Sequence, residues 1–114
     1  MPRDDAAYLL DMLLAARDAI DFASGLTFEQ FEQSRLHQNA ILKSIEIIGE
    51  AAARITVEAK EAHPDILWSE IVGMRNRLVH AYFDVNLTRV WDTVQQDLPR
   101  LITSIEPLVP PEEQ

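Results

Sequence analysis

The sequence predicts an all-α fold, an up-and-down bundle of about five helices, and three observations lead to this prediction. Apolar residues recur every three or four positions through most of the chain. No segment alternates apolar and polar residues over the length of a strand, and no glycine-rich phosphate loop occurs. The 114 residues, 47% of them hydrophobic and 25% charged, are enough for one packed domain. We therefore expect a single helical domain over 1–114, with a flexible tail from about residue 108.

The first expected helix spans residues 4–23. Its apolar residues have helical spacing, and acidic residues at its start favour the positive end of the helix dipole. Ser24 and Gly25 provide a stop, after which Thr27 and Gln30 have the spacing of a capping box. A second helical segment therefore begins after a turn of only a few residues.

The segment 27–60 is too long for one straight helix of a small domain, so we expect a break near Ser34. The longer helix that follows has two apolar stripes, which implies two packing partners. The second stripe either packs inside the bundle or meets another copy of the chain. The first stripe contains Ile41, Ile45, Ile48, Ala52 and Ile55, and the second contains Leu36, Ala40, Ile47 and Ala51.

Two prolines divide the rest of the chain. Pro64 ends the preceding segment, and the next helix is expected over 68–82. Asn86 follows a turn and can cap another helix, which Pro99 should kink or restart.

Composition excludes several classes of protein. The absence of cysteine excludes disulfides, thiolate catalysis and zinc-thiolate sites, and no apolar run approaches the length of a membrane span. Acidic residues occupy positions that an apolar signal sequence would need, so we expect a cytoplasmic protein. The net charge of -9 opposes binding to nucleic acid.

The segment 68–82 carries the side chains of greatest chemical interest. Trp68, Ile71, Val72, Leu78, Val79 and Tyr82 form an apolar stripe. Arg75 interrupts that stripe, so its guanidinium should meet an acid, line a cleft or hold an anion. Asn76 and His80 are four residues apart and are expected to stack on the neighbouring face, while Gly73 suggests close backbone approach or space for a ligand.

These residues also permit a purely structural interpretation. Arg75 could form a salt bridge with Glu46 or Glu50, and His80 could satisfy carbonyl groups at a helix end. His37 and His63 lack the spacing of metal ligands and are expected at the surface. We therefore expect no metal site.

The segment from Arg75 to His80 resembles the arginine, four residues, histidine motif of HEPN ribonucleases, and Ala81-Tyr82 extends it to the pattern of the HepT-like toxins. The segments 45–51 and 68–74 also look like blocks of this family, in the expected order. The resemblance covers roughly residues 4–108. Leu67 and Asn86 depart from the pattern, which weakens assignment to a particular subfamily but leaves the catalytic positions intact.

The resemblance implies a HEPN-like homodimer and a metal-independent endoribonuclease without a cofactor. Arg75 and His80 match the catalytic positions and Asn76 a supporting one, and RNA would be cleaved by attack of its 2′-hydroxyl. The protein would then be the toxin of a type VII-like HEPN/MNT toxin-antitoxin pair. Its antitoxin, an MNT-type nucleotidyltransferase, would add AMP to Tyr82.

Two alternatives from other classes remain open. The bundle could be a noncatalytic module that docks a nucleotidyltransferase or a nucleotide, or a structural helical dimer in which Arg75 is an interface salt bridge. If RNA is the substrate, binding must be local, and we expect Arg75, Arg77 and Arg89 to concentrate positive potential around the cleft. Tyr82 could also simply be a core aromatic residue.

Overall fold

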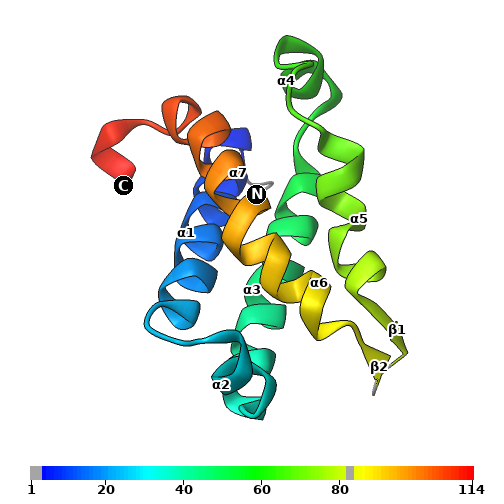
Figure 1. Cartoon of the computed structure of the whole chain (residues 1–114). Helices are drawn as coiled ribbons and strands as arrows, with labels where there is room; N and C mark the ends of the chain where they lie inside the picture. Colours follow the sequence, from blue (N-terminus) through cyan, green and yellow to red (C-terminus); the bar gives the residue numbers. More distant parts are fainter. Residues whose placement is uncertain (1–3, 82–83) are drawn as a thin grey trace.

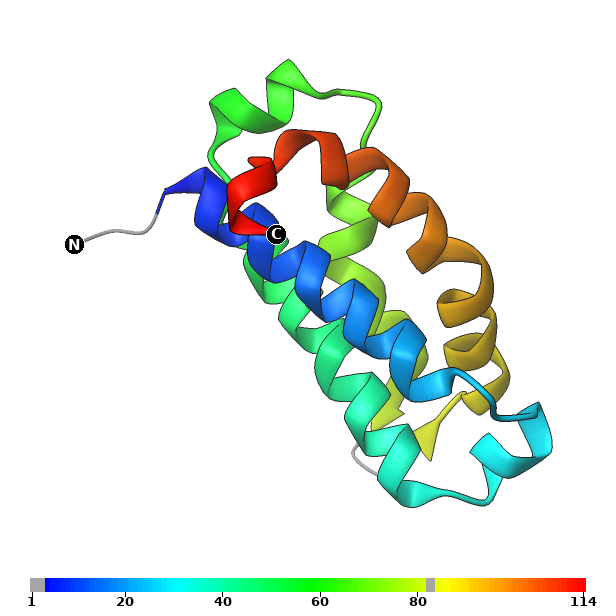
Figure 2. The ribbon, with the colours of Figure 1, turned by 90° about the vertical axis from the view of Figure 1, so that its left-hand side faces the viewer.

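The computed structural model describes residues 4–81 and 84–114, and their chain is almost entirely helical. Long helices α1 and α3 lie side by side, and α5 and the α6–α7 segment pack beside them (Figures 1 and 2). This arrangement confirms the predicted all-α bundle. The helices are α1 (Asp5–Ala23), α2 (Phe28–Glu32), α3 (Arg35–Arg54), α4 (Val57–Ala62), α5 (Trp68–Leu78), α6 (Leu87–Asp92) and α7 (Leu98–Ile105).

The helix starts follow the polar residues in the sequence. The Asp4 carboxylate accepts from the Ala7 amide at 2.9 Å, which caps α1. Thr27 and Gln30 form the predicted capping box of α2, and Ser34 makes the predicted break by capping α3. Gly25, with φ of 82°, occupies the left-handed region in the turn after α1.

A second break in the segment 27–60 was not predicted. Helix α3 ends at Arg54, and Thr56 caps the separate short helix α4. The Asp5 carboxylate holds this break, since it accepts from the Thr56 amide at 2.9 Å and from the Thr56 hydroxyl at 2.7 Å. The contact joins positions 51 residues apart in the sequence, so helical periodicity alone could not indicate it.

The core lies between α1, α3 and the α6–α7 segment. At the lower end of the bundle in Figure 1, Phe31 of α2 is fully buried and packs on Trp91 with ring centroids 5.3 Å apart. Phe28 adds an edge contact to the same indole at 6.0 Å. These aromatic contacts attach the short α2 to α6. The largest fully buried side chains are Phe31, Met12, Leu13, Ile41, Ile45, Ile48, Leu98, Ile105, Val90, Val94 and Val109.

The helix predicted over 68–82 is too long. Helix α5 ends at Leu78 and is followed by a short antiparallel hairpin of β1 (Val79–Ala81) and β2 (Asp84–Val85), although we expected no strand. The carbonyl of Leu78 accepts from the Asn86 amide at 2.8 Å, and Val79 pairs with Val85. A tertiary partner thus replaces the continuing helix, and β-branched valines suit the extended backbone.

Pro99 perturbs the last long helix, as predicted. The segment Thr93–Asp97 between α6 and α7 is a π-helical turn, η1, and Pro99 lies in the first turn of α7. Proline has no amide hydrogen and its ring clashes with the carbonyl four residues earlier, which favours the wider hydrogen-bond spacing. Asn86 caps α6 as predicted, with its side chain accepting from the Arg89 amide at 3.0 Å.

The end of the chain packs on the bundle. Its turns are Glu106–Leu108 and Pro111–Glu113, and Val109 between them is 2% exposed. Arg17 of α1 donates to Glu106 at 2.7 Å and to the Gln114 side chain at 3.0 Å. The buried Val109 and these polar contacts join the segment after α7 to the rest of the bundle. Among the described residues, no helix is both long and apolar enough to cross a membrane.

Candidate functional site

Arg75 and Asn76 lie in the last turn of α5, and both side chains are exposed. The backbone there is fixed, because the Val79 amide donates to the Arg75 carbonyl as the helix ends. Within residues 4–81 and 84–114, neither side chain takes part in a hydrogen bond or ion pair with the protein. A guanidinium and an amide are therefore available to a ligand at this end of the helix.

His80 lies in strand β1, directly after α5, and is also exposed. The predicted stacking of Asn76 and His80 on one helical face is wrong, because the helix stops two residues before the histidine. The strand decides the direction of the side chain instead: Val79 is 9% exposed and its neighbour His80 faces solvent. The hairpin thus presents the imidazole beside the end of the helix that carries Arg75.

The described residues provide no acid for Arg75. Neither predicted salt bridge, to Glu46 or to Glu50, is formed. Among the described residues, the one cation paired with Glu46 is Lys43, at 4.0 Å on the same helix. Val72, expected in the apolar stripe with Arg75, is 38% exposed. The stripe is therefore narrower than predicted, and Arg75 lies at its solvent edge rather than within it.

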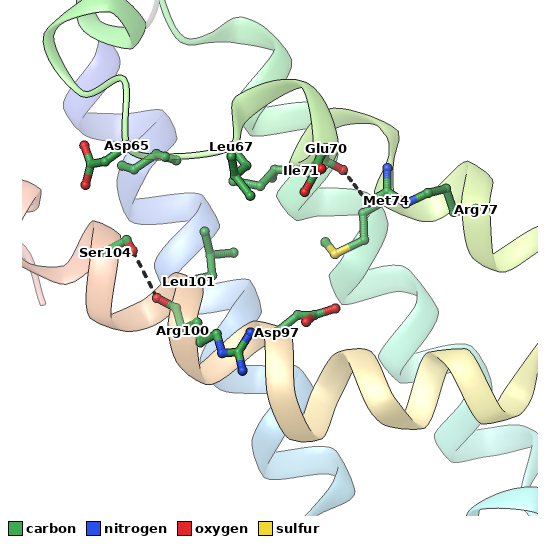
Figure 3. Close-up of a pocket in the computed structure, with 11 residues that line it drawn as sticks. Asp65, Leu67, Glu70, Ile71, Met74, Arg77, Asp97, Arg100, Leu101 and Ser104 are labelled. Carbon is green, nitrogen blue, oxygen red and sulfur yellow. Dashed lines mark hydrogen bonds between the residues drawn. The ribbon is translucent and has the colours of Figure 1, made fainter.

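Arg77 does not join Arg75, contrary to the expected cluster of positive charge. Residues two positions apart on a helix lie on opposite sides. Arg77 folds back along α5 and donates to the Glu70 carbonyl at 2.7 Å. There it lines a pocket between α5 and the η1–α7 segment, which Arg75 does not line (Figure 3). Arg89 lies on α6 with an exposed side chain.

Helices α3 and α5 pack closely at a glycine, but this glycine is Gly49 and not the predicted Gly73. A Cβ on Gly49 of α3 would stand 3.2 Å from the Val72 carbonyl oxygen of α5, whereas a Cβ on Gly73 would meet only the end of the Arg77 side chain at 3.3 Å. Gly49, which the sequence analysis did not single out, therefore sets the approach of α3 to α5.

The other polar candidates take structural roles. His37 is half-buried, and its Nδ1 lies 2.6 Å from the Ser34 hydroxyl oxygen at the start of α3. The carbonyl of His63 accepts from the Trp68 indole at 3.1 Å. Across 4–81 and 84–114, no three His, Asp or Glu side chains converge as metal ligands would. Tyr82, the predicted site of modification, lies outside the described residues.

The second apolar stripe of α3 is only partly free. Ala51 is buried and Ile47 packs against the core, so the bundle itself covers one half of the stripe. Leu36 at the other end is 76% exposed. The bundle thus covers the Ile47–Ala51 half of the stripe and leaves Leu36 exposed.

Fold and site together define an all-α bundle protein that presents an arginine, an asparagine and a histidine at the end of one helix. Residues 12–108 match the family described as "Ribonuclease HepT-like". The chain therefore belongs to the ribonuclease HepT-like family, which confirms the resemblance found in the sequence and the enzyme class that it implied.

Two relatives show how far the similarity extends. The chain is 38% identical over 108 residues to "Probable ribonuclease HepT" of Thermococcus cleftensis, covering 95% of this chain and 98% of that protein. It is 35% identical over 104 residues to "Putative RNase MJ1380" of Methanocaldococcus jannaschii, covering 91% and 95% respectively. No solved structure matches the chain significantly. Similarity to ribonucleases thus extends over nearly the whole chain.

Proposed function

We propose that this protein is a metal-independent endoribonuclease toxin in which Arg75 and His80 are the catalytic residues and Asn76 supports them. The observation that carries the proposal is the exposure of all three side chains at the junction of α5 and β1, in a member of a ribonuclease family. Their spacing resembles the arginine-to-histidine motif that the sequence suggested for this family.

The chemistry assigns each side chain a role. An imidazole changes its charge near neutral pH, so His80 can accept the proton of an RNA 2′-hydroxyl. The 2′-oxygen then bonds to phosphorus and the bond to the 5′-oxygen breaks, which leaves a 2′,3′-cyclic phosphate. The planar guanidinium of Arg75 suits the phosphoryl oxygens on which negative charge develops, and Asn76 can donate a further hydrogen bond.

The leaving 5′-oxygen needs a proton, and one chain offers one histidine at this position. A symmetric homodimer would bring two copies of Arg75 and His80 to one cleft, where one histidine acts as base and the other as acid. The exposed Leu36 of α3 supports an interface with a second copy. A local cleft with two arginines would also offset the net charge of -9 where RNA binds.

Tyr82 follows the catalytic motif by two positions, and we propose that a nucleotidyltransferase antitoxin neutralises the enzyme by adding AMP to it. The hydroxyl of Tyr82 would attack the α-phosphate of ATP, and pyrophosphate would leave. The added phosphate would place negative charge two positions along the chain from His80, and so oppose binding of an RNA phosphate there.

The first test is cleavage of total RNA in EDTA by the protein and its His80→Ala variant, with analysis of the RNA ends. The exposed position of His80 favours a folded variant, which circular dichroism verifies. Cyclic-phosphate ends from the parent, with a rate about 10²- to 10⁴-fold lower in the variant, support the proposal. Equal cleavage by both proteins would overturn the assignment of His80.

A further inference from the structure

A pocket of about 310 Å³ lies between α5 and the η1–α7 segment (Figure 3). The loop before α5, α5 itself and the η1–α7 segment form its walls. Its base is apolar, with Ile66 and Met74 buried and Leu101 opposite them on α7. Arg75 does not line it, so its occupant and RNA need not compete.

Carboxylates surround this apolar base. Asp65 precedes α5, Glu70 lies in its first turn, and Asp97 ends η1. Figure 3 shows Glu70 and Asp97 on either side of Met74. Within the described part of the chain, none of these three carboxylates has an ion pair or a side-chain hydrogen bond. They are free to meet cations of a ligand.

The pocket also has two arginines, but one of them is already engaged. Arg77 donates to the Glu70 carbonyl and lies along α5, whereas Arg100 is exposed at the α7 edge. Three carboxylates against two guanidiniums leave an acidic rim on a chain whose net charge is -9. Charge complementarity therefore favours a basic occupant over an acidic one.

The shape of the pocket suits a protein segment. Leu67 at its mouth is 61% exposed, and Met74 supplies a flexible, polarisable side chain of the kind that adapts to apolar partners. A volume of about 310 Å³ is at the lower limit of typical small-molecule sites, and most of its lining residues are exposed. A shallow groove between two helices can take one or two apolar side chains of an amphipathic helix.

We propose that this pocket docks a basic amphipathic helix of a partner protein. An aliphatic side chain of the partner enters between Ile71, Met74 and Leu101, and flanking lysines or arginines meet Glu70 and Asp97. The interaction does not depend on RNA cleavage, because neither Arg75 nor His80 lines the pocket.

Methyl labelling of methionine gives a direct test. Met74 lines the pocket, whereas Met12 is fully buried elsewhere in the core and serves as an internal control. The probes are a helical peptide with leucines at i and i+4 among lysines, the same peptide with glutamates for lysines, and the lysine peptide with serines for leucines. A Met74→Leu variant assigns the NMR signal.

The lysine–leucine peptide should shift the Met74 methyl signal and leave that of Met12 in place. The glutamate and serine peptides should bind at least about tenfold more weakly. In Glu70→Gln/Asp97→Asn, affinity for the first peptide should fall about five- to tenfold. Asp18→Asn/Glu29→Gln is the matched control, since it removes the same charge from exposed positions outside the pocket and should bind like the parent.

Several results would overturn the proposal. These are an equal shift of Met74 with the glutamate or serine peptide, a Met12 shift as large as that of Met74, equal affinity losses in the two double variants, or no shift at all. A Met74 signal that moves with protein concentration alone would assign the pocket to a second copy of the chain instead.

Discussion

Gly49 of α3 packs against the carbonyl of Val72 in α5, so closely that a Cβ on the glycine would stand 3.2 Å from that oxygen. This contact brings the two helices together one turn before Arg75. Because backbone rather than a flexible side chain forms the contact, neither partner can move without shifting a helix. The placement of the end of α5 that carries Arg75 therefore depends on a glycine in another helix.

Gly49→Ala should lower the free energy of unfolding by about 1–3 kcal/mol, because the methyl group forces α3 and α5 apart. Gly73→Ala is the matched control. There the added methyl meets only the movable end of Arg77, at 3.3 Å, and alanine favours a helix by up to about 1 kcal/mol relative to glycine. Urea denaturation of both variants gives the comparison; a Gly49→Ala protein as stable as the parent would contradict the packing argument.

Phe31→Ala should lower the free energy of unfolding by about 3–5 kcal/mol, since this residue is fully buried and packs on Trp91 at 5.3 Å. The control is Phe22→Ala. Because the Phe22 side chain is 40% exposed, this change should lower the free energy of unfolding by less than about 1 kcal/mol. Thermal unfolding followed by circular dichroism measures both. Equal losses would mean that α2 does not anchor on α6 as described.

Arg75→Ala should reduce kcat/KM for RNA cleavage by about 10²- to 10³-fold. The kcat/KM of Arg75→Lys should lie between the values of that variant and of the parent. Lysine keeps the charge but cannot offer two parallel donors to a phosphate. Arg77→Ala is the control, because Arg77 lies on the opposite side of α5 and donates to a backbone carbonyl. If Arg77→Ala impaired cleavage as much as Arg75→Ala, positive charge in general rather than the position of Arg75 would be responsible.

Tyr82→Phe should remain an active ribonuclease that the antitoxin cannot silence. The change removes only the hydroxyl that would accept AMP. Mass spectrometry after incubation with ATP and a partner nucleotidyltransferase should find added AMP on the parent and none on Tyr82→Phe. Modification of the variant at the same level would show that another residue is the target.

Leu36→Glu should weaken a homodimer, because Leu36 is the most exposed large apolar side chain on α3 and a carboxylate there resists burial. Val57→Glu on α4 is the control, with an apolar side chain that is 64% exposed outside the stripe. Sedimentation of the three proteins over a range of concentrations distinguishes them. A monomeric parent would remove the dimeric cleft, whereas equal dissociation of the two variants would place the interface elsewhere.

Local chemistry in the sequence was sufficient to place most helix boundaries. Thr27 and Asn86 cap their helices as predicted, and Asp4 and Ser34, which lie at predicted boundaries, act as caps there. A cap needs only a side chain and an amide a few residues away. The boundary at Thr56 was missed although Thr56 caps α4 in the same local way; the added contact with Asp5 joins positions distant in the sequence. The end of α5 was missed because it depends on the amide of Asn86, outside the helix.

The sequence predicted some features of the candidate site correctly and others wrongly. The sequence identified Arg75, Asn76 and His80 by residue type and spacing, and the family match supports the enzyme class. Spacing placed Asn76 and His80 on one helical face, and this was wrong because a hairpin follows α5. Arg77 was grouped with Arg75 because RNA needs positive charge, but its side chain folds back to a carbonyl on its own helix.

By itself, the sequence determined the all-α class, the helix starts and the motif residues, because periodicity, caps and residue chemistry are properties of neighbouring positions. Only the tertiary structure decided where α5 stops, which side of it each arginine occupies, and that Gly49 is the close contact between α3 and α5. It also created the pocket between α5 and α7. Each of these features depends on partners far apart in the sequence, whose mutual distances are fixed only when the bundle packs.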